Sequence, residues 1–198
     1  MIRAGLASNP FSGGRFAPGE LPWLADDPCE IERLADRALA SGARHQVLGV
    51  HGSGKSTLLA HLARSGERRG ADVVRFRGSH GVPVGALAAL AGARTPRVVF
   101  VDEVGELGLA GFVLVRAIAA ALGASLVAST HRDLGLPTLL HARVSRTTAA
   151  RVIAHLAPDA AVPCDVDRRL LRHGGNLREV LFELYDDAER AHAAAVRS

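Results

Sequence analysis

A glycine-rich run in the first third of the sequence limits the fold of this chain more narrowly than any other segment. The run extends from Gly49 to Ser56 with the sequence GVHGSGKS, and Lys55 is the only lysine in a chain that is rich in arginine. Glycines at both ends allow successive backbone N–H groups to turn inward around the α- and β-phosphates of a nucleotide. The compact ammonium of Lys55 reaches the β- and γ-phosphates, where the wide planar fork of arginine fits poorly. The run therefore predicts a phosphate-binding loop.

The segments on either side supply the context that such a loop needs. Gln46 to Val50 predicts a short buried strand, and Ser56 to Ala63 predicts the start of a helix with its leucines on one face. A tight turn without a ligand is the alternative, but the succession of strand, loop and helix favours a phosphate site. The Ser56 hydroxyl is then expected to ligate Mg²⁺, and the Thr57 N–H to point at the phosphates. The expected nucleotide-binding residues are Gly49, His51, Gly52, Ser53, Gly54, Lys55, Ser56 and Thr57.

Composition indicates the α/β class. The chain has 198 residues, of which 48% are apolar, so it is long enough for about one domain with a proper core. Aromatic residues are few and alanine is abundant. This combination favours helices that pack closely on a parallel sheet of valine and leucine.

Charge and cysteine content narrow the function classes. The net charge of +4 comes from arginines spread along the whole chain, which permits a nucleic-acid partner but does not require one. Cys29 and Cys164 lie far apart without metal or redox spacing, so we expect free thiols in a reducing cytosol and no structural metal. Asn9-Pro10 interrupts any signal peptide, and the uncharged run from Ala117 to Thr130 is too short to span a bilayer. We therefore expect a cytoplasmic protein that is not bound to a membrane.

The chain divides into three predicted regions. Residues 1–27 form an extended arm, residues 28–147 a P-loop NTPase core, and residues 148–198 a small C-terminal helical lid. The core is expected to be a three-layer sandwich around a mostly parallel sheet. Besides the first strand, the expected strands are Asp72–Arg77, Val98–Val101, Ser125–Ser129 and Val144–Thr147. The expected lid helices are Ala149–Leu156, Asp165–His173 and a long one from Asn176.

Two acidic residues follow the most apolar of these strands. Val98 to Val101 delivers Asp102 and Glu103 to the carboxyl end of the sheet, the edge where open α/β sheets bind ligands. Asp102 is placed to hold Mg²⁺ through its hydration shell, and Glu103 to polarise a water aimed at the γ-phosphate. An acidic turn after a core strand is the alternative.

Polar residues also end the next strand and begin the last helix. Thr130 is a candidate to bind the γ-phosphate or the attacking water, and the neighbouring His131 is a weaker one. Residues of this kind also cap loops at strand ends. Asn176 is expected to cap the last helix, which puts Arg178 in its first turn, where the helix dipole disfavours a cation. A phosphate in front of that turn would reverse this effect, whereas a solvated arginine is the plain alternative.

Together these motifs resemble the AAA+ ATPases, in particular the clamp-loader and replication-initiator branch. Gly49 to Ser56 is similar to Walker A, and Val98 to Glu103 to Walker B. Ser129-Thr130-His131 lies where sensor 1 belongs, and Gly174 to Arg178 is similar to the entry to sensor 2. The resemblance implies that Leu136 to Arg143 carries the arginine finger. Arg143 would then follow a short apolar helix, precede the last strand, and touch the nucleotide of a neighbouring subunit.

The resemblance implies an ATPase that uses ATP and Mg²⁺ to drive a switch or a remodelling step. The catalytic candidates are Glu103, Thr130, Arg143 and Arg178, and the metal candidates are Ser56 and Asp102. Its expected partners are ATP and ADP, with a homo-oligomer or a partner ATPase implied by the arginine finger. A small-molecule or nucleoside kinase and a nucleotide-binding regulatory module are the alternatives. Glu103, placed as a water activator, favours hydrolysis over transfer to another acceptor.

Overall fold

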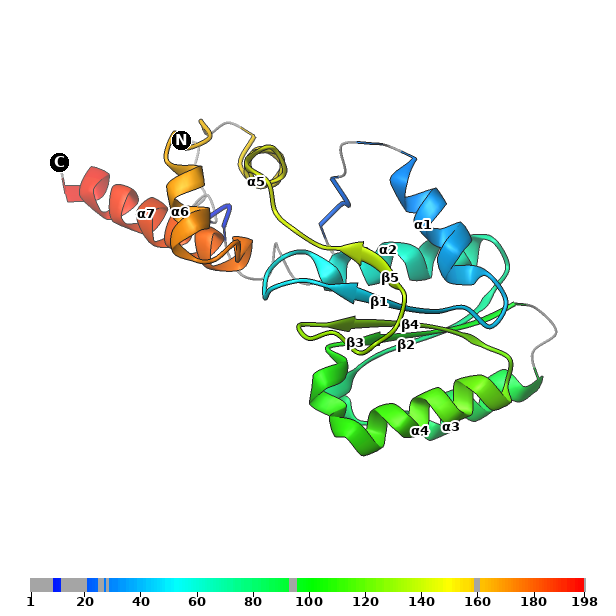
Figure 1. The fold of residues 1–198 in the computed structure, drawn as a ribbon. Helices are drawn as coiled ribbons and strands as arrows, with labels where there is room; N and C mark the ends of the chain where they lie inside the picture. The colour runs from blue at the N-terminus through cyan, green and yellow to red at the C-terminus, as the bar shows by residue number, and fades with distance from the viewer. Residues whose placement is uncertain are drawn as a thin grey trace, which may run out of the picture.

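Five parallel strands form the centre of the fold, in the order β2-β3-β4-β1-β5 (Figure 1). The structure is a computed structural model that describes residues 9–11, 21–24, 27, 29–92, 96–158 and 161–197. Most of the predicted N-terminal arm lies outside these residues. The strands are β1 (Arg44–Leu48), β2 (Asp72–Arg77), β3 (Arg97–Asp102), β4 (Ser125–Thr130) and β5 (Thr138–His141).

Helices cover both faces of this sheet. The helices α1 (Glu30–Leu39) and α2 (Lys55–Arg68) lie on one face, and α3 (Val84–Ala89) and α4 (Gly108–Ala121) lie on the other (Figure 1). Both faces of the sheet are apolar, because the side chains of β3 alternate between two hydrophobic cores. Val98 and Phe100 pack with α1 and α2, whereas Val99 and Val101 pack with α3 and α4. The predicted α/β class with a parallel sheet between helix layers is confirmed.

Three further helices form a separate unit beyond the carboxyl ends of the strands (Figure 1). They are α5 (Arg146–Leu156), α6 (Val166–Arg172) and α7 (Leu177–Arg197). Their apolar residues, among them Ile153, Leu170 and Val180, form a core of their own, to which Phe11 also contributes. We call α5 to α7 the lid. The exact boundaries between arm, core and lid stay predictions.

The predicted last strand and the helix before it are wrong. The fifth strand is Thr138–His141, reached from β4 through a loop without a helix, and residues 142–145 form another loop. The strand propensity of the Val144–Thr147 segment is overridden by a helix cap, because the Ser145 Oγ accepts a hydrogen bond from the Thr148 N–H at 3.0 Å and starts α5. Arg143 therefore follows the last strand instead of preceding it.

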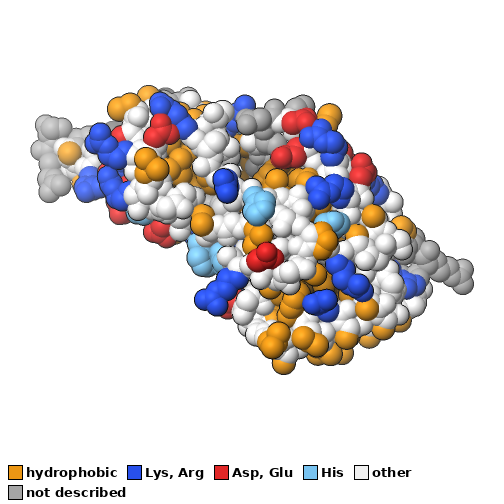
Figure 2. Space-filling model, in the orientation of Figure 1, with side chains coloured by type: hydrophobic (Ala, Val, Ile, Leu, Met, Phe, Trp, Pro, Cys, Tyr) orange, Lys and Arg blue, Asp and Glu red, His pale blue; other side chains and the backbone are white. Residues whose placement is uncertain are grey.

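The segment Val104–Ala121, which contains α4, is long and apolar enough to cross a membrane by length and composition. Phe112, Val115 and Ala119 of α4 pack against the sheet. Other apolar side chains of α4, including Leu109 and Val113, stay exposed, and Figure 2 shows apolar patches where this helix lies.

Candidate active site

The predicted phosphate loop connects β1 to α2 at the carboxyl edge of the sheet. Gly52 and Gly54 have φ angles of 66° and 90°, a left-handed conformation that favours glycine. Gly49 is fixed by packing, because a Cβ atom there would lie 2.5 Å from both the Ala142 carbonyl oxygen and the Ser53 Oγ. The loop thus has the tight glycine geometry that a phosphate cradle requires.

Lys55 is held inside this loop. Its side chain is buried, and its Nζ donates hydrogen bonds to the carbonyl oxygens of Gly49 at 2.9 Å and Val50 at 2.7 Å. Burial lowers the pKa of Lys55, and the negative charges of Asp102 and Glu103 oppose that effect. The ammonium therefore lies against the backbone of the loop, close to the position from which it would reach a bound phosphate.

Ser53 carries an unsatisfied polar group in the same loop. Its buried Oγ finds no hydrogen-bond partner among the described residues. Leaving a buried hydroxyl unpaired costs about 1–3 kcal/mol. A hydroxyl in such a position is suited to donate to a ligand oxygen, so the loop fits a phosphate group better than it fits an empty turn.

The two predicted metal ligands lie side by side. The Ser56 Oγ donates to the Asp102 Oδ1 at 3.1 Å, and the Ser129 Oγ donates to the same oxygen at 2.6 Å. A hydroxyl and a single carboxylate are hard oxygen ligands of the kind that hold Mg²⁺ together with substrate phosphates. No cluster of three or more acidic, histidine or cysteine side chains suited to a metal occurs in the described part of the chain. The residues therefore fit Mg²⁺ bound together with a nucleotide.

Glu103 adopts a strained backbone conformation. Its φ of 53° makes it the only non-glycine residue with positive φ in the described ranges, and such strain costs about 1–3 kcal/mol. The Ser129 Oγ accepts a hydrogen bond from the Glu103 N–H at 2.8 Å. On the other side, the Arg77 Nε lies 3.4 Å from the Glu103 Oε2. Strain held in place by neighbours is common at functional sites.

Ser129 and Arg77 were missed from the sequence. Arg77 ends β2 and pairs in register with Asp102 of β3, so strand register alone brings it to the acidic pair. Ser129 lies one residue before the predicted candidate. Because side chains alternate along a strand, Ser129, which bonds to Asp102, and Thr130 point to opposite faces of the sheet.

Thr130 is turned away from the phosphate loop. Its Oγ1 donates to the Arg132 carbonyl oxygen at 2.7 Å and accepts the Arg132 N–H at 3.1 Å, which makes a local turn. His131 contacts the loop instead: its Nδ1 lies 2.9 Å from the Gly49 carbonyl oxygen and 3.3 Å from the Lys55 Nζ. The His131 ring packs against the His51 ring with 3.7 Å between centroids. Burial lowers the pKa of His131, and the charges of Lys55 and His51 act in the same direction.

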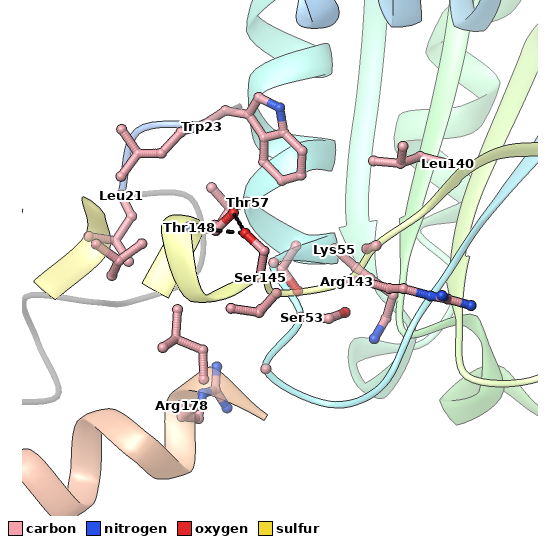
Figure 3. A pocket seen from close by; sticks show the side chains of 18 of the residues that line it. Leu21, Trp23, Ser53, Lys55, Thr57, Leu140, Arg143, Ser145, Thr148 and Arg178 are labelled. Carbon is pink, nitrogen blue, oxygen red and sulfur yellow. Dashed lines mark hydrogen bonds between the residues drawn. The ribbon is translucent and has the colours of Figure 1, made fainter. Parts of the chain in front are cut away.

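A cavity of about 340 Å³ opens beside the loop. Its walls come from the loop, Glu103, residues 21–24, residues 140–145, α5 and the start of α7 (Figure 3). Trp23 was not expected here, because the sequence shows no legible base-binding motif in residues 1–23. Its indole N–H donates to the Glu30 Oε2 at 2.8 Å, which fixes the ring on the cavity wall.

Arg143 and Arg178 also line this cavity (Figure 3). Within the described residues neither guanidinium makes a hydrogen bond or an ion pair. Arg178 thus lies where the sequence predicted, on the first turn of the last helix. Arg143 lines the cavity of its own chain, and its contact with the nucleotide of a neighbouring subunit stays a prediction.

Comparisons with known proteins place the fold. No protein-family model matches the chain, and no curated protein matches it. Among solved structures, Drosophila ORC bound to DNA is 18% identical, with a TM-score of 0.62, over 98% of this chain and 64% of that one. The replication initiator DnaA bound to AMPPCP and single-stranded DNA is 13% identical, with a TM-score of 0.56, over 83% of this chain and 63% of that one. AMPPCP-bound DnaA from Aquifex aeolicus is 14% identical, with a TM-score of 0.55, over 91% of this chain and 70% of that one.

These neighbours show that the chain has the fold of the AAA+ P-loop ATPases. The chain spans slightly less than two thirds of the length of the DnaA and ORC chains that it covers at 63% and 64%. The resemblance to this fold predicted from the Walker motifs is thereby confirmed.

Proposed function

We propose that this protein binds ATP in the cavity beside the phosphate loop and hydrolyses it with Mg²⁺. One observation carries the proposal. Lys55, Arg143 and Arg178 line one cavity, while the two arginines have no anionic partner in the described part of the chain and the Ser53 hydroxyl is unpaired. A polyphosphate supplies the acceptors and the negative charge that this arrangement needs.

Each side chain has a distinct task in the proposed reaction. The N–H groups of the loop and of the first turn of α2 bind the α- and β-phosphates, and Lys55 moves from its carbonyl partners to the β- and γ-phosphates. Ser56 and Asp102 hold Mg²⁺, which offsets the charge of the phosphates. Glu103 orients and polarises the attacking water, and Arg77 holds its carboxylate between turnovers.

The remaining candidates act on the γ-phosphate. Arg178 approaches it from the lid. Because Arg143 lines the cavity of its own chain, we propose that it contacts the nucleotide bound by that chain, so that hydrolysis does not require a second subunit. His131 takes over the contact first assigned to Thr130, since it is the imidazole that reaches the loop. The side chains of residues 21–24 bind the base.

We propose that the hydrolysis drives a conformational change in this protein or in a partner. A switch or a remodelling step in the cytoplasm agrees with the fold and with the free thiols of Cys29 and Cys164. The ORC structure and one of the DnaA structures are complexes with DNA. A nucleic acid or a partner ATPase is therefore a reasonable client to test.

The deciding experiment measures phosphate release from ATP in the presence of Mg²⁺ and the absence of any other acceptor. We expect release by the wild type and none above background by Lys55→Ala. Release that appears only after a metabolite or nucleoside is added would favour the kinase alternative. Tight ATP binding without release would favour a regulatory module. Addition of single- or double-stranded DNA then shows whether nucleic acid stimulates turnover.

A further inference from the structure

The first residues of α7 rest directly on the phosphate loop. A Cβ atom added to Gly52 would overlap the Asn176 Oδ1, and it would lie 2.9 Å from the Asn176 Cγ and 3.0 Å from the Arg178 backbone nitrogen. Contacts this close to a Cβ position leave no room for any side chain at Gly52. The lid therefore touches the loop at one of the glycines that shape the phosphate cradle.

Asn176 has a second role in the same geometry. Its Oδ1 accepts a hydrogen bond from the Arg178 N–H at 3.1 Å, as a cap does at the start of a helix. One side-chain oxygen thus both begins α7 and contacts the loop. Arg178, which lines the nucleotide cavity, is only two residues away. Any movement of Asn176 relative to Gly52 must also move Arg178 relative to the phosphates.

The lid has few other apolar ties to the loop. Its core, formed by residues such as Ile153, Leu170 and Val180, is separate from the two cores that flank the sheet. The covalent link runs through residues 142–145 between β5 and α5. On the loop side, Val50 approaches the lid next to Gly52, with its Cγ2 3.8 Å from a Cβ position on Gly175. A unit with its own core and a narrow contact is suited to move as a body.

We propose that Asn176 latches the lid onto the phosphate loop, so that nucleotide enters and leaves only when the contact between Asn176 and Gly52 opens. Asn176 is then a positioning residue that places Arg178 and couples the lid to the loop. This inference rests on the proposed function for the nucleotide, whereas the contact itself can be tested without any nucleotide.

A double-mutant cycle on the nucleotide-free protein tests the contact. Gly52→Ala adds the overlapping Cβ, and Asn176→Gly removes the side chain that it meets, with little loss of capping because glycine is tolerated at a helix N-cap. We expect Gly52→Ala to lower the midpoint of thermal unfolding by about 10 °C in the wild type and by less than about half of that in Asn176→Gly. The remaining loss comes from the positive φ of Gly52 and from the close approach of the Arg178 backbone nitrogen, which are the same in both backgrounds.

Gly54→Ala is the matched control. Gly54 lies in the same loop with a positive φ, but a Cβ there would lie 3.5 Å from the Trp23 Cζ3, an ordinary contact. Its cost should be the same with and without Asn176→Gly. Equal costs for Gly52→Ala in the two backgrounds would show that the lid does not rest on the loop in solution, and would overturn the proposal. If Gly52→Ala does not fold alone, recovery of folding in the double variant is the supporting result.

The gating role is tested by the rate of nucleotide release. We expect Asn176→Gly to increase the dissociation rates of fluorescent ATP and ADP analogues about tenfold, and to increase their association rates as well. Unchanged rates would overturn the gating. If the wild type binds no nucleotide, the proposed function and the gating fail together, but the unfolding cycle still decides whether the lid contacts the loop.

Discussion

The two walls of the nucleotide cavity differ in how their charges are satisfied. On the loop wall, Lys55 donates to backbone carbonyls, Ser56 donates to Asp102 behind the wall, and the Glu103 N–H donates to Ser129. On the opposite wall, the guanidinium group of Arg178 has no partner in the residues that the structure describes, and the same holds for Arg143, which lies beside Lys55 (Figure 3).

This difference suggests that the loop wall acts in the chemical step and that the arginines act in binding the anion. The loop wall is held by hydrogen bonds within the protein, so apart from the Lys55 side chain its groups need little rearrangement during the reaction. Arg143 and Arg178 gain charge-assisted hydrogen bonds when an anion binds. We therefore expect changes on the loop wall to affect the chemical step most, and changes on the opposite wall to affect affinity.

The largest effect is expected for Glu103→Gln on the loop wall. The amide keeps the shape of the side chain but cannot polarise water as a carboxylate does, so turnover should fall at least about 100-fold. ATP affinity should change little. Steady-state phosphate release and a binding titration measure the two quantities. Glu106→Gln, which alters an exposed carboxylate three residues away, is the control and should be unaffected. Turnover at the wild-type rate would assign the activation of water to another residue.

On the opposite wall, Arg178→Ala should weaken ATP binding about tenfold, which is the loss of one hydrogen bond to a charged group. ADP binding should weaken less, because the arginine acts mainly on the γ-phosphate. Calorimetric titrations with both nucleotides make the comparison. Arg190→Ala removes an exposed arginine farther along α7 and serves as the control. Equal losses for ATP and ADP would place Arg178 away from the γ-phosphate.

On the loop wall, Ser53→Ala is expected to change protein stability and ATP binding in opposite directions. Because the Ser53 Oγ is buried without a partner, its removal should raise the free energy of unfolding of the nucleotide-free protein by about 1 kcal/mol. The same change should weaken ATP binding a few-fold. Denaturant unfolding measures the change in stability, and a titration with ATP measures the change in affinity. A loss of stability would mean that the hydroxyl already has a partner in solution.

The smallest effect concerns pH. Burial is the main cause that lowers the pKa of His45, His61 and His131 below the ordinary value of about 6.5. The unfolded chain therefore takes up protons before the folded protein does as the pH falls. Stability should be complete above about pH 6.5 and should decline below it. His131→Gln should flatten part of this decline, as measured by thermal unfolding between about pH 5 and 8. An identical pH profile in the variant would contradict the shifted pKa of His131.

The loop wall could be predicted from the sequence because its signals are local. The glycine spacing of Gly49 to Ser56 and the apolar run before Asp102 each define a strand and the loop after it, and the structure has both, although β1 ends at Leu48 and not at the predicted Val50. The strand β5 was missed because Thr138–His141 is a four-residue edge strand, too short to show a period.

Side-chain roles that depend on register could not be read from the sequence. Whether Thr130 or His131 faces the loop depends on strand parity, which the pairing of β4 with β3 and β1 fixes. The contact of Arg77 with Glu103 needs the register of β2 on β3. The approach of Asn176 to Gly52 depends on how the lid docks, which no local pattern encodes.

The central claim is that the loop around Lys55 binds the phosphates of ATP. Its most direct test is a calorimetric titration of Mg²⁺-ATP into the wild type, Lys55→Ala and Lys55→Arg. We predict binding by the wild type and a loss of at least about 100-fold in Lys55→Ala, because the buried ammonium is the proposed phosphate ligand on this wall. Arginine should not restore binding, since its planar fork does not fit between the loop carbonyls. ATP affinity that stays the same in both variants would contradict the claim.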